Sequence, residues 1–323
     1  MLKTLAKGSI YDVARVSGVS IGTVSRVFNS KPDVAEKTRT LVIEAAKQVN
    51  YMPRIGTRRV NIGLVVQEIE KANEVGFVSH AISTLVKHMA MRGGVLELVQ
   101  LDNTDAIHRN CIRGLIAVFF GPDTGTLGAI RNMPIVSINN DLPGDNVHTV
   151  ASDHAQGAYM ATKYLLDRGH KKIGFLEIQS DGWVSKERQR GYKKAFDEAG
   201  VARRVEWMSF CGHEPARNSV IPLMESKPTA LLVCGEDLSL AVNHVLLHEL
   251  KIRIPDDLSV ITFETSLVSA LLTPPQTTVC QPWEDLGRAA VDTIFSLVEN
   301  KQSAPIKLFF PNKLIERSSV RTL

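Results

Sequence analysis

Continuous runs of apolar residues recur from residue 62 onward, and stretches with a helical pattern separate them. The runs cover residues 62–66, 95–101, 115–120, 134–138, 173–176, 230–234 and 258–263. Because they are apolar at successive rather than alternate positions, they are typical of strands buried on both faces. They predict parallel sheets with helices on both sides, an α/β fold of the doubly wound kind.

This pattern extends over about 260 residues, which is more than a single hydrophobic core usually holds. We therefore expect two α/β lobes, each built on its own parallel sheet. A cleft between two such lobes is a natural place for a small ligand.

Positive charge is concentrated at the start of the chain. Residues 1–60 hold eleven Lys and Arg against four Asp and Glu, a net charge of +7, whereas all 323 residues together have only +4. The remainder is slightly acidic. This asymmetry indicates that the basic segment, and not the rest of the chain, binds a polyanion.

Within the basic segment, two short helical patterns flank Gly18. Ser9 and Asp12 have the spacing of a capping box, which opens a helix. Gly18 ends that helix, since glycine adopts the left-handed conformation that a tight turn requires. Ser20 then caps a second helix. Its inward residues are Val24, Val27 and Phe28, and a third amphipathic segment, residues 35–49, has its apolar stripe at Leu41, Val42, Ala45 and Val49. The combination predicts a helix-turn-helix.

The outward face of the second helix has the chemistry of a major-groove reader. Arg26 is suited to a bidentate contact with guanine, and Ile21 offers an apolar contact to a thymine methyl group. Gly22 allows close approach of the backbone, whereas hydroxyl and amide side chains suit phosphates. The candidate DNA-contacting residues are Tyr11, Ser20, Ile21, Gly22, Thr23, Ser25, Arg26, Asn29 and Arg54.

The run IYDVARVSGVSIGTVSRVFN, residues 10–29, resembles the DNA-binding head of the LacI/GalR family of transcription regulators. The match continues through VAEKTR at residues 34–39 and YMP at residues 51–53. The resemblance implies a repressor that binds operator DNA. It also implies a homodimer, because this class of head binds paired half-sites.

The rest of the chain resembles the core of the same family, which shares its architecture with periplasmic sugar-binding proteins. The matching motifs are RQRGY at 188–192, PTA at 228–230, GED at 235–237, IPDDLSV at 254–260, PPQTTV at 274–279 and LIERSS at 314–319. The resemblance implies a small effector, a sugar or a sugar derivative, bound between the lobes.

By that resemblance Arg188 is the foremost candidate for effector contact, because a guanidinium clamps ligand oxygens in fork geometry; the alternative is a solvated arginine at a helix start. Glu236 and Glu264 stand where relatives have Asn and Asp, so the pocket differs in size. Trp183 suits stacking on a sugar, and a packing role fits it equally well. The candidate effector-binding residues are Asn139, Trp183, Arg188, Glu236, Asp237 and Glu264.

We expect a helix-turn-helix domain at 1–53, a short hinge at 54–61, lobe 1 at 62–151 plus about 283–309, and lobe 2 at 152–282 plus about 310–323. The hinge departs from the family, whose leucine-bearing helix wedges into the minor groove. Here it reads RIGTRRVN, short, with an interior Gly56 and no leucine. We predict no wedging helix, and phosphate or minor-groove contacts from Arg54, Arg58 and Arg59.

Two other function classes fit less well. An enzyme would need a nucleophile with a base or a metal cluster, and neither is legible in the sequence. Residues 18–22 fit G-x-S-x-G, but no strand precedes them as that motif requires. A sugar sensor without DNA function is disfavoured by the complete head.

We expect no cofactor and no metal. His244 and His248 have a zinc-like spacing but no third ligand, and residues 121–128 lack the Gly-Lys-Ser/Thr of a phosphate loop. Cys111, Cys211, Cys234 and Cys280 are expected as buried thiols. With no signal peptide and no long apolar stretch, we expect a cytoplasmic protein that does not enter the membrane.

Overall fold

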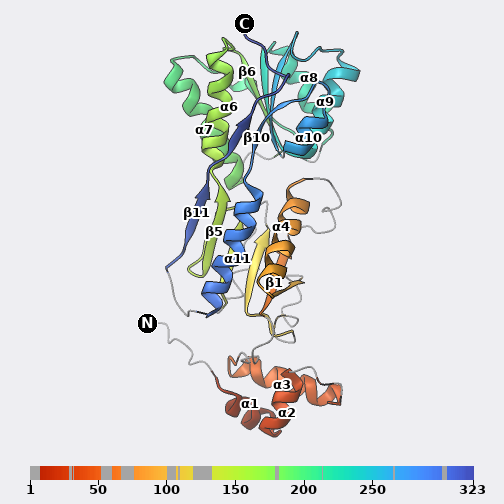
Figure 1. Cartoon of the computed structure of the whole chain (residues 1–323), viewed down its shortest axis with the longest axis vertical. Helices are drawn as coiled ribbons and strands as arrows, with labels where there is room; N and C mark the ends of the chain where they lie inside the picture. The colour runs from red at the N-terminus through yellow and green to blue at the C-terminus, as the bar shows by residue number, and fades with distance from the viewer. Residues whose placement is uncertain are drawn as a thin grey trace.

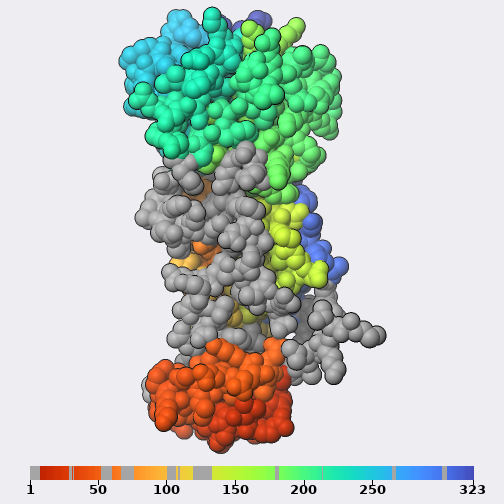
Figure 2. Space-filling model, turned by 180° about the vertical axis from the view of Figure 1, so that it is seen from behind, coloured from red at the N-terminus to blue at the C-terminus, as the bar shows by residue number. Residues whose placement is uncertain are grey.

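The computed structural model describes residues 8–28, 31, 33–51, 60–66, 76–99, 107, 110–118, 133–178, 182–212, 214–264, 266–299 and 304–323. The predictions for Asn29, Arg54, most of the hinge at 54–61 and the segment 121–128 lie outside these residues. The described part forms a small helical head and two α/β lobes, stacked along the long axis of the molecule (Figures 1 and 2). The predicted fold class is confirmed.

The head consists of α1 (Ile10–Ser17), α2 (Ile21–Phe28) and α3 (Glu36–Gln48). The capping box forms: the amide of Ser9 donates to Asp12 Oδ2 over 3.0 Å, and the amide of Asp12 donates to Ser9 Oγ over 3.3 Å. Gly18 ends α1 in the left-handed conformation, at φ 68°. The turn therefore forms as the sequence predicts.

The core of the head contains the predicted inward residues of α2, since Val24, Val27 and Phe28 are buried. The predicted stripe of α3 is partly wrong, because Leu41 is 47% exposed. Ile43 and Ala46 are buried in its place, beside Val42 and Ala45. Successive residues of a helix are about 100° apart, so a core centred between positions 42 and 46 leaves position 41 facing outward.

Two six-stranded sheets organise the lobes, in the orders β11-β5-β4-β3-β1-β2 and β12-β10-β9-β8-β6-β7. We call the part built on the first sheet lobe 1 and the part built on the second lobe 2. The first sheet is parallel throughout, and the second is parallel except for β12, which runs antiparallel to β10.

In lobe 1 the elements are β1 (Asn61–Val66), α4 (Phe77–Met91), β2 (Val95–Leu98), β3 (Gly114–Val118), β4 (Ile135–Ile138), β5 (Val147–Ser152), α11 (Trp283–Glu299) and β11 (Lys307–Phe310). In lobe 2 they are α6 (His154–Asp167), β6 (Ile173–Glu177), α7 (Trp183–Ala199), the 3₁₀ turn η3 (Val205–Trp207), β7 (Met208–Phe210), α8 (Arg217–Glu225), β8 (Ala230–Cys234), α9 (Glu236–His244), the π-turn η4 (Val245–Glu249), β9 (Ser259–Glu264), α10 (Ser266–Leu271), β10 (Thr277–Cys280) and β12 (Lys313–Ile315).

Each sheet is covered on both faces by apolar packing. Helices α4 and α11 pack together on one face of the lobe 1 sheet, and a second buried cluster, which includes Ile112 and Leu115, lies on its other face. In lobe 2, α6 and α7 cover one face, and α8 and α9 cover the other. This two-sided burial explains why the central strands are continuously apolar.

Within the described ranges the chain passes from one lobe to the other three times: between β5 and α6, between β10 and α11, and between β11 and β12. The three passages bring carboxyl ends of parallel strands in both lobes toward the same region. Sites for small ligands in parallel α/β proteins lie at such strand ends.

The thiol of Cys111 in lobe 1 lies 3.7 Å from the carbonyl oxygen of Phe28, so lobe 1 touches the head there. Cys111, Cys211 and Cys234 are buried and Cys280 is half-buried, all as free thiols. In the described ranges, no helix combines the length and the apolar character that a membrane crossing demands.

Candidate DNA-binding surface and effector site

Helix α2 presents its first turn to solvent. Ser20 caps it, accepting the amide of Thr23 on Oγ over 3.1 Å, and its hydroxyl lies 2.9 Å from that of Thr23. Next to this cap, Ile21 is 42% exposed and Gly22 is exposed as well. Tyr11 on α1 is 69% exposed, and Ser25 is half-buried. These residues are thus available to a partner as large as a DNA duplex.

Arg26, in the last turn of α2, is exposed and forms an ion pair with Asp33. The pair lies at the surface, so its contribution to stability is small. To contact a base edge, the Arg26 guanidinium has to break the ion pair with Asp33 or bind the base and Asp33 with different N–H groups. Asp33 is a residue that the sequence did not single out, although it lies only seven positions from Arg26.

Polar side chains gather where the chain passes between the lobes. We call them the cleft cluster: Asn139, Ser152, His154, Glu177, Ser185, Arg188 and Gln281. Asn139 follows β4 in the left-handed region, at φ 54°, which Asn tolerates better than most residues. Its Nδ2 donates to Gln281 Oε1 over 2.6 Å, and its Oδ1 accepts the amide of Ser152 over 2.9 Å. Both ends of the Asn139 amide are therefore engaged within the protein.

His154, the first residue of α6, joins these strand ends to lobe 2. Its Nε2 lies 3.0 Å from Asn139 Oδ1. Because that oxygen can only accept, Nε2 carries the proton and Nδ1 is an acceptor. Burial, and then the nearby Arg188 charge, hold the pKa of His154 well below its usual value, so the ring is neutral at pH 7.

Arg188 and Glu177 form a buried ion pair in lobe 2. Arg188 Nη1 donates to Glu177 Oε1 over 2.5 Å, and Ser185 Oγ donates to Glu177 Oε2 over 2.8 Å. Both charged residues are less than 9% exposed. Burial raises the pKa of Glu177, and Arg188 and Ser185 counter part of that rise. The solvated-arginine alternative for Arg188 is thereby excluded.

The position of Arg188 depends on a close crossing of α6 and α7. A Cβ atom on Gly191 would lie 2.0 Å from the carbonyl oxygen of Ala155, so only glycine permits this contact. Arg188 is one turn before Gly191, and the crossing brings it to the start of α6. The glycine of the RQRGY motif thus has a packing role that places the arginine.

Aromatic rings lie beside Arg188 and His154 of the cleft cluster. The Arg188 guanidinium lies 4.4 Å from the centre of the Phe263 ring. The Trp183 ring stacks on that of Phe309 at 6.0 Å and meets the edge of His154 at 5.7 Å. Trp183 is half-buried in these contacts. The site therefore combines flat apolar surfaces with a few fixed polar groups, which is typical of small-molecule sites.

Lobe 1 and lobe 2 also meet at α9. Nε2 of His80 on α4 lies 3.4 Å from Glu236 Oε2, and the imidazole stacks on Trp283 at 6.1 Å. A Cβ atom on Gly76 would lie 3.2 Å from Asp237 Oδ2. The predicted residues Glu236 and Asp237 thus face lobe 1, at the start of α9.

The structure brings Asn139, Trp183 and Arg188 together through His154, and it places Glu236 and Asp237 at the lobe contact. Glu264 is the last residue of β9, and its side chain is outside the described part. Sequence reasoning missed His80, His154, Glu177, Ser185, Trp283 and Gln281. His154 had no signal in the sequence, and the only one for Gln281 was that it closely follows the PPQTTV motif at residues 274–279.

Three buried polar atoms around the cleft cluster have no hydrogen-bond partner within the described part of the chain: His154 Nδ1, Arg188 Nε and Trp283 Nε1. Proteins rarely leave buried donors and acceptors unsatisfied. Arg188 Nε and Trp283 Nε1 are donors and His154 Nδ1 is an acceptor, so the cluster leaves two donors and one acceptor unsatisfied.

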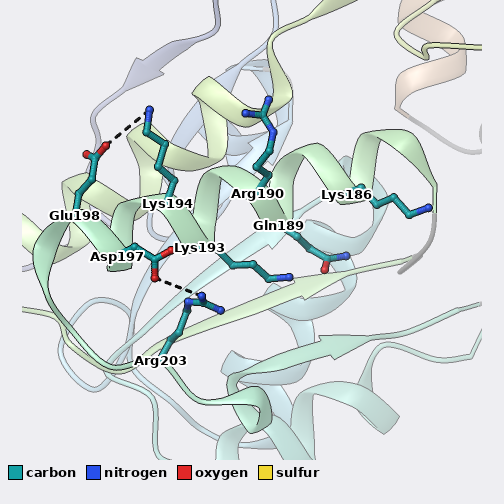
Figure 3. A pocket seen from close by; sticks show the side chains of 8 residues that line it. All are labelled: Lys186, Gln189, Arg190, Lys193, Lys194, Asp197, Glu198 and Arg203. Carbon is teal, nitrogen blue, oxygen red and sulfur yellow. Dashed lines mark hydrogen bonds and ion pairs between the residues drawn. The ribbon is translucent and has the colours of Figure 1, made fainter.

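A separate hollow of about 790 Å³ lies along the exposed side of α7 (Figure 3). Its side chains are Lys186, Gln189, Arg190, Lys193, Lys194, Asp197, Glu198 and Arg203. Lys194 pairs with Glu198 at 3.7 Å, and Arg203 pairs with Asp197 at 3.3 Å. None of the predicted effector residues lines this hollow. Across the described ranges, no group of three or more His, Cys, Asp and Glu is arranged to hold a metal ion.

Two family models match the chain. "Bacterial regulatory proteins, lacI family" matches residues 9–54, and "Periplasmic binding protein-like domain" matches residues 162–320. The HTH-type transcriptional repressor PurR of Pasteurella multocida is 29% identical over 334 residues, which cover 97% of this chain and 99% of that relative.

Solved structures share the fold. A complex of the transcriptional regulator CelR with cellobiose has a TM-score of 0.71 at 23% identity, covering 97% of this chain and 100% of that one. The lac repressor dimer bound to operator and the anti-inducer ONPF has a TM-score of 0.67 at 22% identity, covering 98% of this chain and 99% of that one.

Proposed function

The chain belongs to the lacI family of bacterial regulatory proteins, and from this premise we propose that a sugar or sugar derivative, bound between the lobes, controls the binding of its head to operator DNA. It is a DNA-binding repressor of transcription modulated by a small molecule, and a repressor is a binding protein rather than an enzyme. The observation that carries the effector proposal is the cleft cluster, with buried polar atoms at the strand ends of both lobes.

For the head, we propose that the start of α2 enters the major groove, with Arg26 and Ile21 at base edges and Gly22 allowing close approach. Phosphates or sugars of the DNA backbone would then be contacted by the remaining candidates, which are Tyr11, Ser20, Thr23, Ser25, Asn29 and Arg54. The exposure of the first turn of α2 and the charge of +7 on residues 1–60 support this assignment.

For the effector, we propose direct contacts from Arg188, Trp183, Glu236, Asp237 and Glu264. Asn139 would act by positioning, because its amide already binds Gln281 and Ser152. Two solved structures with a similar fold contain sugars, which supports a sugar as the effector here. CelR is in complex with cellobiose, and a LacI family regulator from Enterococcus faecium has bound ribose.

The effector proposal is tested by a thermal-shift screen against sugars, sugar phosphates and nucleosides, followed by calorimetry with the ligand that binds. Arg188→Ala should weaken that ligand at least tenfold, since a charged hydrogen bond is lost. Arg190→Ala, an exposed arginine on the same helix, is the matched control. Affinity of Arg188→Ala within twofold of wild type would remove Arg188 from the site.

We further propose a cytoplasmic homodimer. Exposed apolar side chains lie on α4, α9 and α10, which Figure 1 shows along one flank of the two lobes: Val86 (51%), Met91 (74%), Leu240 (40%), Leu267 (65%) and Leu271 (77%). Large exposed apolar residues that gather on one side are typical of an interface. The domain limits we propose are those expected from the sequence, with the hinge at 54–61.

Sedimentation of the variant Met91→Glu/Leu271→Glu tests the dimer. It should be monomeric at concentrations where wild type is dimeric, because charges would be buried in the interface. Val205→Glu, at an apolar position on η3 that is 87% exposed, is the control and should remain dimeric. A dimer of unchanged stability in the double variant would contradict this interface.

A further inference from the structure

Glu177 places a carboxylate next to Arg188, the permanently charged cation of the proposed effector site. It is the last residue of β6 and pairs in register with Cys234 on β8, so it lies at the carboxyl end of two adjacent strands. It is 4% exposed. The contacts of 2.5 Å from Arg188 and 2.8 Å from Ser185 hold both of its oxygens in place.

This pairing offsets the positive charge that Arg188 presents to a ligand. Within the cleft cluster as described, Arg188 is the only side chain with a permanent positive charge, and His154 is neutral. Glu236 and Asp237 add two carboxylates on the α9 side. The groups around the cleft therefore carry more negative than positive charge.

An anionic ligand meets two costs in such a site. It has to compete with Glu177 for the guanidinium, and in a partly buried place it is repelled by Glu177 at close range. An uncharged ligand with hydroxyl or amide groups has neither cost and can use the buried donors and acceptor. Repulsion of a wrong ligand is an established route to specificity.

We propose that Glu177 determines the charge selectivity of the effector site, so that the cleft accepts uncharged ligands and rejects phosphorylated or carboxylated ones. The proposal rests on the proposed function, since it concerns the same cleft. It narrows the effector class to uncharged sugars and comparable uncharged molecules, and it excludes sugar phosphates.

The test uses inorganic phosphate as the probe and the thermal midpoint of the full-length protein as the readout, with sodium chloride of equal ionic strength as the reference. Phosphate at about ten times its dissociation constant should raise the midpoint of Glu177→Gln by roughly 3 °C, because Arg188 is then an unpaired cation. Wild type should show no rise over the chloride reference. Glu177→Gln/Arg188→Gln should lose the effect while keeping the same basic surfaces on the head and on α7.

Equal phosphate responses in Glu177→Gln and in the double variant would overturn the proposal. If Glu177→Gln alone does not fold, wild type and Arg188→Gln decide: a phosphate-specific rise in wild type that Arg188→Gln abolishes would contradict it, and no rise would support it. The assay uses neither operator nor effector. Failure of the repressor proposal would instead appear in the operator-binding and ligand screens.

Discussion

His80 of lobe 1 and Glu236 of lobe 2 are in contact across the two lobes, with Nε2 and Oε2 3.4 Å apart. The imidazole of His80 stacks on the ring of Trp283, with an angle of 25° between the ring planes. Glu236 is buried at the start of α9, whereas the His80 side chain is 32% exposed. The pair therefore links the lobes at the edge of the site where we place the effector.

We expect removal of this link to weaken the effector. In His80→Phe the stack on Trp283 is kept and the contact with Glu236 is lost, so the dissociation constant should rise about 3- to 10-fold, the value of one hydrogen bond. Calorimetry with the ligand found in the screen measures this. His244→Phe, in the last turn of α9, is the control. Unchanged affinity in His80→Phe would show that the contact between His80 and Glu236 has no part in binding.

Acid should destabilise the protein through His154. Burial first, and then Arg188, lower its folded-state pKa well below 6.5, so the unfolded chain binds a proton that the folded chain does not. The contribution of His154 to the free energy of unfolding is therefore fully present above pH 6.5 and decreases as the pH falls below that value. Acidification from pH 7.5 to pH 5.5 should lower the free energy of unfolding by about 1 kcal/mol through this one residue.

Thermal midpoints at the two pH values measure the effect. His154→Gln, whose amide retains a donor for Asn139, should lose about 2–4 °C less than wild type on acidification. The comparison isolates His154 from His148 and His170, whose pKa values burial also lowers. An identical pH dependence in wild type and variant would show that His154 is not the responsible group.

For the hinge we predict less DNA bending than a wedging helix produces. Residues 54–61 contain Gly56, which costs about 1 kcal/mol relative to alanine inside a helix, and they offer no leucine to insert between base pairs. Coupling between effector and DNA would then act through the spacing and orientation of the two heads. A bend-dependent gel-mobility assay on the specific complex decides the matter. A sharp central kink, with these residues helical in the minor groove, would refute the prediction.

The sequence predicted the central strands because those strands are apolar on both faces. It missed β5, β7, β10, β11 and β12, whose sequences mix Ser, Thr, His or Lys with apolar residues. Thr278 shows the reason: it is buried on β10, but its hydroxyl donates to the carbonyl of Thr262 over 3.1 Å. A satisfied hydroxyl can be buried at little cost, so polarity alone does not exclude a buried strand.

The candidate effector site was predictable only in part, for a similar reason. Arg188 stands in a motif, whereas its partner Glu177 lies eleven positions away on another element and has no motif of its own. Asn139 was expected to face the ligand, but its amide binds Gln281 and Ser152, which lie at two of the passages between the lobes. Such pairings depend on which strand ends become neighbours, which one-dimensional spacing does not encode.

Binding of operator DNA by α2 is the central claim, and selection from a random duplex library tests it most directly. The full-length protein should enrich a near-palindromic pair of half-sites. Arg26→Ala should then lose about 1–3 kcal/mol of specific affinity and keep its salt-dependent non-specific binding. Asp33→Asn, which removes only the ion-pair partner of Arg26, should retain specificity. No enriched sequence, or an Arg26→Ala variant that discriminates operator from random DNA as well as wild type does, would contradict the account.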